Sequence, residues 1–294
     1  MRVVLYSMAA KCKFYIYPGT KFISPYTNQP VNAISISKGY EEFEHPMFVA
    51  TLTYAYPDRF ITPLIYEMIG TYKRNKLVLP YDMHKIFGIE FVDRFIVATE
   101  AGKITNDGKA VTQSGSINIF TMQAYADPIK RILSQPIAPW SPVSVAPGKE
   151  YIVTGGICQS ECEYSLMGVV DVWETKFNGT FSEPLHLNTT FKFDSWVTTV
   201  ECSPDGNYIM VGCQNGNLSL LSRKNQDGGD IPWARIKNVK KAVEVTSPPL
   251  SAHANPYPYI NQFMPQVMQI NWAPDGNRFV VSSPTGSVFK VYSL

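Results

Sequence analysis

The sequence holds four histidines, and none has a spacing that builds a catalytic or metal site. They are His45, His84, His186 and His253. A metal centre or a nucleophile–histidine pair needs such side chains to converge with further ligands or with an activated hydroxyl or thiol. No HExxH motif or paired histidine spacing is present, so we expect no catalytic histidine, no metal site and no cofactor.

Two of the five cysteines lie close enough in sequence to bind the same metal ion. Cys158 and Cys162 flank Glu161, a group that could hold a metal ion on a loop. A zinc site normally needs a second ligand pair at a matching spacing, and none follows. We therefore expect incidental loop cysteines here. Cys202 and Cys213 fall within strand-like apolar runs and are expected in the core.

A basic strip lies on a segment whose pattern indicates an outer strand. It consists of Arg235, Lys237, Lys240 and Lys241. Alternation along a strand would place Arg235 and Lys237 on one face, where they could contact an acidic protein or nucleic acid. A solvated outer strand, protected from edge pairing by its lysines, also explains the strip, and we favour that interpretation.

Charge and composition limit the classes of function and fold. The 294-residue chain carries 26 basic and 24 acidic residues, a formal net charge of +2. A dedicated polyanion binder normally shows a strong basic excess, so no direct nucleic-acid binding is expected. Aromatic residues make up 13% of the chain, and it has 22 prolines and 19 glycines. This composition favours many short strands joined by turns over helices.

Nothing in the sequence predicts membrane insertion or export. It has no run of about 18 apolar residues, which a spanning helix would need. Residues 1–13 lack the apolar length of a signal peptide. Five cysteines are too few, and odd in number, for a disulfide framework in a chain of this length. We therefore expect an intracellular protein, cytoplasmic or nuclear, that is not secreted.

The C-terminal part repeats a pattern of strand, turn, strand, turn and strand. The pattern runs from Trp196 to Ser222 and again from Val267 to Leu294, with a Pro-Asp-Gly turn after each first strand. Proline presets the first corner of such a turn, and glycine accepts the positive φ that ends it. In the last strand, alternation places Lys290 and Tyr292 on one side and Val291 on the other.

Looser copies precede these two and bring the number of units to six. We place the units at residues 1–30, 31–81, 82–137, 138–193, 194–262 and 263–294. The first lacks its innermost strand and the last lacks its outermost. Small antiparallel sheets in a fixed order are typical of a propeller, because one such sheet cannot cover both of its faces and must stack against its neighbours.

The repeats resemble those of the WD-repeat family. The resemblance rests on two Pro-Asp-Gly turns, two glycine-containing ends of second strands and one third strand: Ser203–Gly206, Ala273–Gly276, Gly155–Gly156, Val211–Gly212 and Val170–Trp173. It covers residues 140–294 well and residues 1–135 by pattern alone. The family's Gly-His pair is absent and no unit ends in Trp-Asp, so the chain resembles a divergent branch.

The resemblance and the repeats imply an all-β fold, a β-propeller of about six (five to seven) four-stranded antiparallel blades in a single domain over residues 1–294. The incomplete units at the ends leave three alternatives. Residues 1–7 form the outer strand of the last blade, or the ring is open and a partner supplies strands, or sequence upstream of Met1 completes the ring.

Three connections are longer than a plain blade needs, at residues 100–113, 157–165 and 245–265. The first two join second to third strands, and the third joins an outer strand to the next inner one, so all three should emerge on one rim. Loops of this length are usually functional, and the third contains an aromatic Pro-Tyr-Pro-Tyr run that suits an interface. Packing across the rim explains that run equally well. If the rim binds a partner, the residues expected to contact it are Lys103, Asp107, Gln159, Glu161, Tyr164, His253, Tyr257 and Tyr259.

The resemblance implies a non-catalytic scaffold, a subunit of a larger intracellular assembly whose partners are other proteins, with no small-molecule substrate. Two alternatives stay open. Propellers also host metal-dependent hydrolases and lactonases, which need acidic, histidine or asparagine side chains at the starts of inner strands. Asn32, Glu90 and Asp194 lie near such positions but form no consistent set. An RNA-associated scaffold in translation or RNA processing would keep the fold and change the partner.

Overall fold

The computed structural model consists, in its described residues, of β-strands and the turns that join them. These residues are 3–7, 12–16, 31–36, 47–52, 64–69, 72–78, 86–92, 95–100, 102–104, 111–121, 130–137, 141–147, 150–159, 166–175, 184–225, 227–242, 269–282 and 289–294. No helix occurs among them, and hence none long and apolar enough to cross a membrane. The expected all-β class is therefore confirmed.

Four antiparallel sheets have four strands each. The first contains β3 (Val31–Ile36), β4 (Met47–Leu52), β5 (Leu64–Ile69) and β6 (Tyr72–Val78). The second contains β7 (Ile86–Val92), β8 (Phe95–Glu100), β11 (Gly115–Thr121) and β12 (Lys130–Ile137). The third contains β13 (Ser141–Pro147), β14 (Tyr151–Gln159), β15 (Leu166–Glu174) and β16 (His186–Phe193). The fourth contains β17 (Val197–Cys202), β18 (Tyr208–Cys213), β19 (Leu218–Lys224) and β20 (Asp230–Val239).

Three smaller sheets complete the described strands. A three-stranded sheet at the C-terminal end contains β21 (Gln269–Trp272), β22 (Arg278–Ser282) and β23 (Phe289–Ser293). A hairpin at the other end contains β1 (Val3–Ser7) and β2 (Cys12–Ile16). A second hairpin, between β8 and β11, contains β9 (Lys103–Ile104) and β10 (Val111–Gln113).

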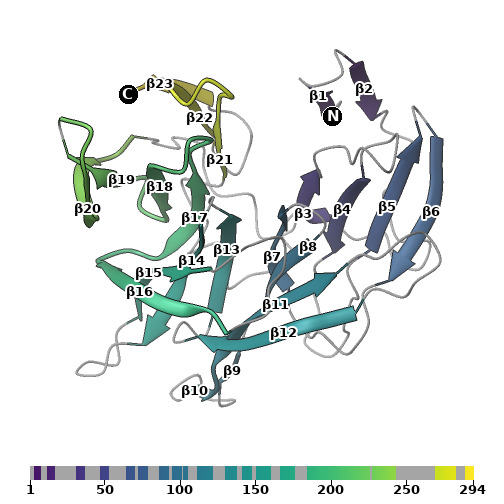
Figure 1. Cartoon of the computed structure of the whole chain (residues 1–294), viewed down its shortest axis with the longest axis horizontal. Helices are drawn as coiled ribbons and strands as arrows, with labels where there is room; N and C mark the ends of the chain where they lie inside the picture. Colours follow the sequence, from purple (N-terminus) through teal and green to yellow (C-terminus); the bar gives the residue numbers. More distant parts are fainter. Residues whose placement is uncertain are drawn as a thin grey trace, which may run out of the picture.

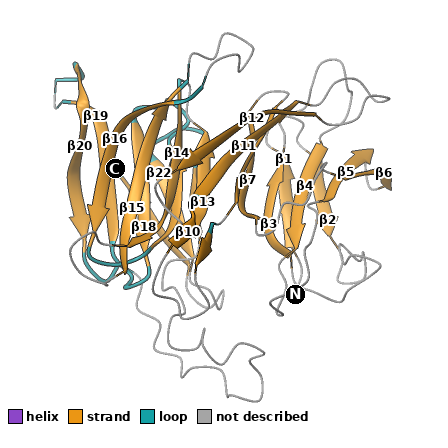
Figure 2. Ribbon diagram, turned by 90° about the horizontal axis from the view of Figure 1, so that it is seen from below, coloured by secondary structure: helices purple, strands orange, loops and turns teal. Residues whose placement is uncertain are grey.

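The four four-stranded sheets and the three-stranded sheet stand side by side around a common axis, with the first strand of each nearest the axis (Figure 1). The inner strands β3, β7, β13, β17 and β21 contact one another in that order along the chain. In the view turned by 90°, the strands of neighbouring sheets run roughly along one direction (Figure 2). This radial stacking is the architecture of a β-propeller, as the repeats predict.

The core lies between the sheets, because the middle strands are apolar on both faces. On β18, Ile209 and Val211 pack with Val153 of the preceding sheet, whereas Met210 packs with Ile270 of the following one. Each of these side chains is at most 3% exposed. A strand buried on both faces loses the simple apolar–polar alternation, which explains why these segments read as continuous apolar runs.

The Pro-Asp-Gly turns fold as their sequence dictates. Gly206 has φ 75° and Gly276 has φ 71°, in the left-handed region that residues with a side chain avoid. In the first turn, Asp205 Oδ1 accepts hydrogen bonds from Ser203 Oγ at 2.5 Å and from the Asn207 backbone N–H at 3.1 Å. These bonds hold the pKa of the Asp205 carboxyl below its usual range, against the opposing effect of desolvation. In the second turn, Asp275 Oδ1 accepts from the Asn277 N–H at 3.0 Å.

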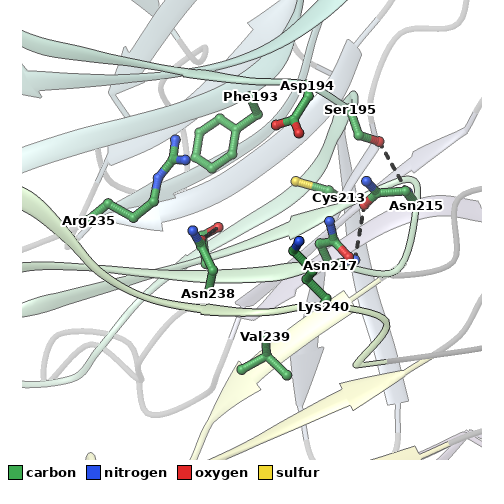
Figure 3. Close-up of a pocket in the computed structure, with 11 residues that line it drawn as sticks. Phe193, Asp194, Ser195, Cys213, Asn215, Asn217, Arg235, Asn238, Val239 and Lys240 are labelled. Atoms are coloured by element: carbon green, nitrogen blue, oxygen red, sulfur yellow. Dashed lines mark hydrogen bonds between the residues drawn. The ribbon is translucent and has the colours of Figure 1, made fainter.

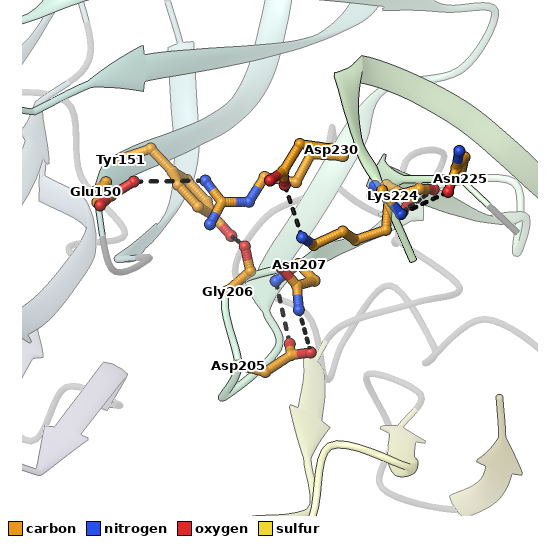
Figure 4. A network of polar contacts seen from close by, with 11 residues as sticks. Glu150, Tyr151, Asp205, Gly206, Asn207, Lys224, Asn225 and Asp230 are labelled. Atoms are coloured by element: carbon orange, nitrogen blue, oxygen red, sulfur yellow. Dashed lines mark hydrogen bonds and ion pairs between the residues drawn. The ribbon is translucent and has the colours of Figure 1, made fainter. Parts of the chain in front are cut away.

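The first of these turns also joins two sheets, in the network shown in Figure 4. The buried Tyr151 hydroxyl, at the start of β14, donates to the Gly206 carbonyl at 2.8 Å. The Arg223 guanidinium lies 5.7 Å from the centre of the Tyr151 ring and 3.7 Å from a Glu150 carboxylate oxygen. Polar contacts therefore align the third and fourth sheets at this rim while the apolar core fills the space between them.

The unit boundaries predicted from the repeats agree with the sheets, each of which falls within one unit. The last sheet has three strands, as expected. Its β23 also alternates as predicted: Lys290 Nζ and Tyr292 Oη both donate to the Ala242 carbonyl, at 2.6 and 2.9 Å, and Val291 is 69% exposed on the other side.

The alternative in which residues 1–7 complete the last sheet does not hold among the described strands. There β1 pairs with β2, and β23 pairs with β22. The other two alternatives for ring closure stay predictions.

Candidate functional site

The rim expected to carry the long loops can be located from the ends of the strands. In the fourth sheet, the Gln214 backbone N–H donates to the Trp196 carbonyl at 2.8 Å. The turn between second and third strands therefore lies beside the connection that enters the inner strand. We call this the loop-bearing rim, and the rim with the Pro-Asp-Gly turns the opposite rim.

Two of the eight residues expected to contact a partner lie in described strands. Lys103 is in β9, within the connection from β8 to β11, and Gln159 is the last residue of β14. The other six lie outside the described residues: Asp107, Glu161, Tyr164, His253, Tyr257 and Tyr259. Their role in binding therefore stays a prediction.

A small polar pocket opens on the loop-bearing rim, where the third sheet meets the fourth (Figure 3). It encloses about 80 Å³ and is lined by side chains from three stretches of chain. They include Asp194 from the connection between the sheets, Asn215 and Asn217 from the turn after β18, and Asn238 and Lys240 from the end of β20. The sequence alone does not reveal this pocket, because its walls come from segments about 20 residues apart.

Two asparagines of this wall fix the local backbone. Asn215 Oδ1 accepts from the Asn217 backbone N–H at 3.1 Å, which closes an Asx turn. Asn217 Oδ1 in turn accepts from the Lys241 backbone N–H at 2.9 Å. Lys241 has φ 48°, and Gly216 has φ 84°, so the chain turns sharply at both places. The pocket wall is therefore built from side chains that also hold the turns in place.

A β-bulge places Arg235 in the pocket and turns Lys237 away from it. Arg235 pairs with Leu221 and Lys237 with Leu220, with a register shift between them. Adjacent residues of β19 point to opposite faces, so their two partners do as well. The expectation that Arg235 and Lys237 share one face is therefore wrong.

Arg235 is held on its face by two contacts. Its guanidinium carbon lies 4.2 Å from the centre of the Phe193 ring, and its Nη2 donates to the Lys192 carbonyl at 2.8 Å. A cation over an aromatic face is attracted by the ring quadrupole. Arg235 therefore bridges β20 to the end of β16 and forms a fixed wall of the pocket.

Cys213 forms the floor of the pocket and is chemically inert. The thiol is free and 3% exposed. Burial raises its pKa to about 12, a rise that the positive charge of Arg235 reduces and the negative charge of Asp194 increases. A thiol that keeps its proton at neutral pH is a poor nucleophile and a poor metal ligand. Cys213 and Cys202 are both buried, as expected of core residues.

The hub region carries two acidic side chains close enough to interact. Glu90 lies on β7 and Glu201 on β17, both inner strands. Burial, and then the negative charge of Glu90, raise the pKa of Glu201 well above its usual range. Among the described residues, no three His, Cys, Asp or Glu side chains are grouped so as to hold a metal ion. This pair therefore does not make a metal centre within that part of the chain.

Comparison with known proteins relates the chain to β-propellers. No protein-family model matches it. The Cps50 (Swd1) β-propeller domain of Myceliophteria thermophila superposes with a TM-score of 0.60 at 13% sequence identity, over 100% of this chain and 77% of that one. At this identity the likeness shows the fold alone, and it confirms the β-propeller that the WD-repeat resemblance implied.

Two curated proteins match a short part of the sequence. The intraflagellar transport protein 122 homologs of Homo sapiens and Mus musculus are 39% and 38% identical to it over 58 residues, 20% of this chain. The chain covers 4% and 5% of the length of these relatives.

Proposed function

We propose that this protein is a non-catalytic scaffold, a subunit of a larger assembly that binds other proteins through its loop-bearing rim. The observation that carries the proposal is the radial stack of sheets with a polar pocket on that rim. Stacked sheets hold several surface segments of this chain at fixed positions. Little binding free energy is therefore lost in ordering those segments when a partner binds. The short match to intraflagellar transport protein 122 homologs agrees with a role in an assembly.

The size and chemistry of the pocket support binding over catalysis. Pockets for small molecules usually measure about 300–1,000 Å³, several times the volume of about 80 Å³ seen here. Its one thiol is protonated at neutral pH, and amide side chains make up much of its wall. Neither feature provides a nucleophile, and Asp194, the one carboxylate among the lining residues, has no histidine beside it in the lining to form a catalytic pair.

The residues proposed to contact the partner are the eight on the three long connections. The aromatic ones, Tyr257 and Tyr259, are the expected anchors, because interface energy concentrates in a few aromatic and arginine side chains. Protein partners inside the cell, in the cytoplasm or nucleus, are the class we propose.

Affinity purification from native extract tests the proposal. The tagged full chain should capture a defined set of proteins, and the Tyr257→Ala/Tyr259→Ala variant should capture less of them. The matched control, Tyr292→Phe, removes a hydroxyl that bonds to the Ala242 carbonyl within the fold and should leave capture unchanged. Equal capture by all three chains would contradict the proposed face. Stoichiometric zinc or calcium in the purified protein would contradict the non-catalytic assignment.

A further inference from the structure

The polar pocket offers hydrogen-bond donors, because the amide oxygens of its two turn asparagines are turned toward backbone N–H groups. Asn215 Oδ1 accepts from the Asn217 backbone N–H, and Asn217 Oδ1 accepts from the Lys241 backbone N–H. An amide oxygen has two lone pairs; each of these bonds uses one of them and directs the oxygen toward the backbone, so the NH2 group lies on the other side of the amide. In Figure 3 the side chains of Asn215, Asn217 and Lys240 converge on the space in front of Cys213.

The charges around this space also favour an acceptor. The Lys240 ammonium has donors and no acceptor, and Lys240 is exposed at the mouth of the pocket. Arg235 adds a second positive charge to the wall, although its guanidinium is engaged by Phe193 and the Lys192 carbonyl. Asp194 brings the one negative charge among the lining residues. The balance is positive, with two amide NH2 groups beside it.

The pocket is small, about 80 Å³, against about 300–1,000 Å³ for pockets that hold whole small molecules. Its size therefore suits the end of one side chain. A carboxylate is such a group, and its oxygens can accept from several donors at once. A charge-assisted hydrogen bond is stronger than a neutral one, so one buried carboxylate would give a well-defined anchor.

We propose that this pocket binds the carboxylate of a glutamate or aspartate side chain from an acidic segment of a partner protein. The donors are Asn215 Nδ2, Asn217 Nδ2 and Lys240 Nζ. Asp194 weakens binding by repulsion and so restricts the site to ligands that reach all three donors. The inference rests on the proposed scaffold function and adds the chemistry of the partner.

Isosteric substitutions test the donors without disturbing the turns. Asn217→Asp keeps the oxygen that accepts the Lys241 N–H and replaces the NH2 donor by an anionic oxygen. The matched control is Asn225→Asp, on the opposite rim, whose Oδ1 accepts the Gly229 backbone N–H at 2.6 Å in the same way. Asp194→Asn removes the opposing charge at nearly constant volume.

The measurement is NMR titration of the 15N-labelled full chain with two blocked tripeptides, acetyl-Gly-Glu-Gly-amide and acetyl-Gly-Lys-Gly-amide. The side-chain NH2 signals of Asn215 and Asn217 report the site, and each is assigned by its loss in the corresponding Asn→Asp variant. We expect saturable shifts with the Glu peptide and none with the Lys peptide. Binding should weaken about ten-fold or more in Asn217→Asp, because a charge-assisted bond is replaced by repulsion. It should tighten in Asp194→Asn and stay unchanged in Asn225→Asp.

Two results would overturn the inference. One is an absence of shifts with the Glu peptide, and the other is binding of the Lys peptide that Asp194→Asn abolishes, which would make this a site for a cation. The scaffold proposal fails separately. If Asn217→Asp captures the full partner set and Tyr257→Ala/Tyr259→Ala does not, the pocket is wrong and the scaffold stands. If the Glu peptide binds but no partner co-purifies, the pocket stands and the scaffold proposal is wrong.

Discussion

A buried carboxyl on β15 shows how burial alters a single residue. Asp171 is 1% exposed, and its Oδ1 accepts from Thr190 Oγ1 at 2.6 Å. Its Oδ2 has no hydrogen-bond partner among the described residues. Desolvation raises the pKa of this carboxyl, against the lowering effect of the Thr190 bond. A buried charge with one unpaired oxygen is costly, so folding shifts this carboxyl toward its protonated form.

This raised pKa predicts a loss of stability with rising pH. Above about pH 4 the unfolded chain has largely released the Asp171 proton, while the folded chain, whose pKa is raised, releases it at higher pH. The folded state then binds more protons, so the free energy of unfolding falls as pH rises through this window. Asp171→Asn, which keeps an oxygen for Thr190, should flatten that part of the curve. Urea unfolding of both chains between pH 4 and 7 measures this, and parallel curves would contradict the prediction.

A buried hydrogen bond joins the side chains of Trp173 and Thr154 on neighbouring strands. Trp173 Nε1 on β15 donates to Thr154 Oγ1 on β14 at 3.1 Å, and both side chains are buried. An indole N–H usually finds a partner when it is buried. The pair lies on the face toward the second sheet, where Trp173 packs with Ile117 and Ile119. It therefore ties the two middle strands together at the edge of an apolar cluster.

Breaking this bond from either side should cost similar stability. Trp173→Phe and Thr154→Val should each lower the free energy of unfolding by about 1–3 kcal/mol, since each leaves a buried polar group unpaired. The double variant should lose less than the sum, by about 0.5–1.5 kcal/mol, because the orphaned partner is also removed. Strict additivity in denaturant unfolding would show that the bond contributes nothing.

At the scale of the element, a glycine on β15 permits the close approach of the next sheet. A Cβ at Gly168 would overlap the Ser195 carbonyl oxygen and lie 2.9 Å from the Val197 backbone nitrogen. Both are backbone atoms, so neither can rotate out of the way as a flexible side chain can. Gly168 therefore sets the distance between β15 and the start of β17.

Gly168→Ala should destabilise the protein by about 1–3 kcal/mol, the usual cost of overpacking. Gly229→Ala is the control. There the nearest atoms belong to the end of the Asn225 side chain, at 3.3 Å and beyond, so the change should be small. Thermal or urea unfolding of the two variants compares them directly, and equal losses would mean that the close contact is relieved by a shift of the strand.

The bulge in β20 gives a prediction in which two basic residues differ. Arg235→Ala removes the contact with the Phe193 ring and the hydrogen bond to Lys192, and should cost about 1 kcal/mol. Lys237→Ala, on the other face of the exposed strand, should stay within about 0.5 kcal/mol of the parent. If both variants lose the same stability, the two side chains share one environment and the bulge is misplaced.

The sequence allowed the repeat boundaries to be predicted, because the features that mark them are local. The Pro-Asp-Gly turns at Ser203–Gly206 and Ala273–Gly276 have the positive φ that their glycines predict. The bulge was missed, because it depends on pairing with β19 and not on residues within β20. The Trp173–Thr154 bond was missed for the same reason, since 19 residues separate its partners.

At the scale of the whole molecule, the stacking of sheets determines what the surface can present. Connections from second to third strands and connections between sheets meet on one rim, and the Pro-Asp-Gly turns meet on the other. The polar pocket arises where Asp194, the Asn215–Asn217 turn and the end of β20 come together on the loop-bearing rim. Asn215 and Asn217 are visible in the sequence as turn residues, but their place in a pocket could be found only once the third and fourth sheets were placed.

Footprinting of the assembled complex tests the central claim, that partners bind the loop-bearing rim. The full chain with its co-purified partner is compared with the free chain by hydrogen exchange and hydroxyl-radical labelling. We predict protection at residues 102–104, 157–159, 214–217 and 238–241, and none at the opposite-rim turns, residues 204–207 and 274–277. Protection confined to those opposite-rim turns would contradict the account.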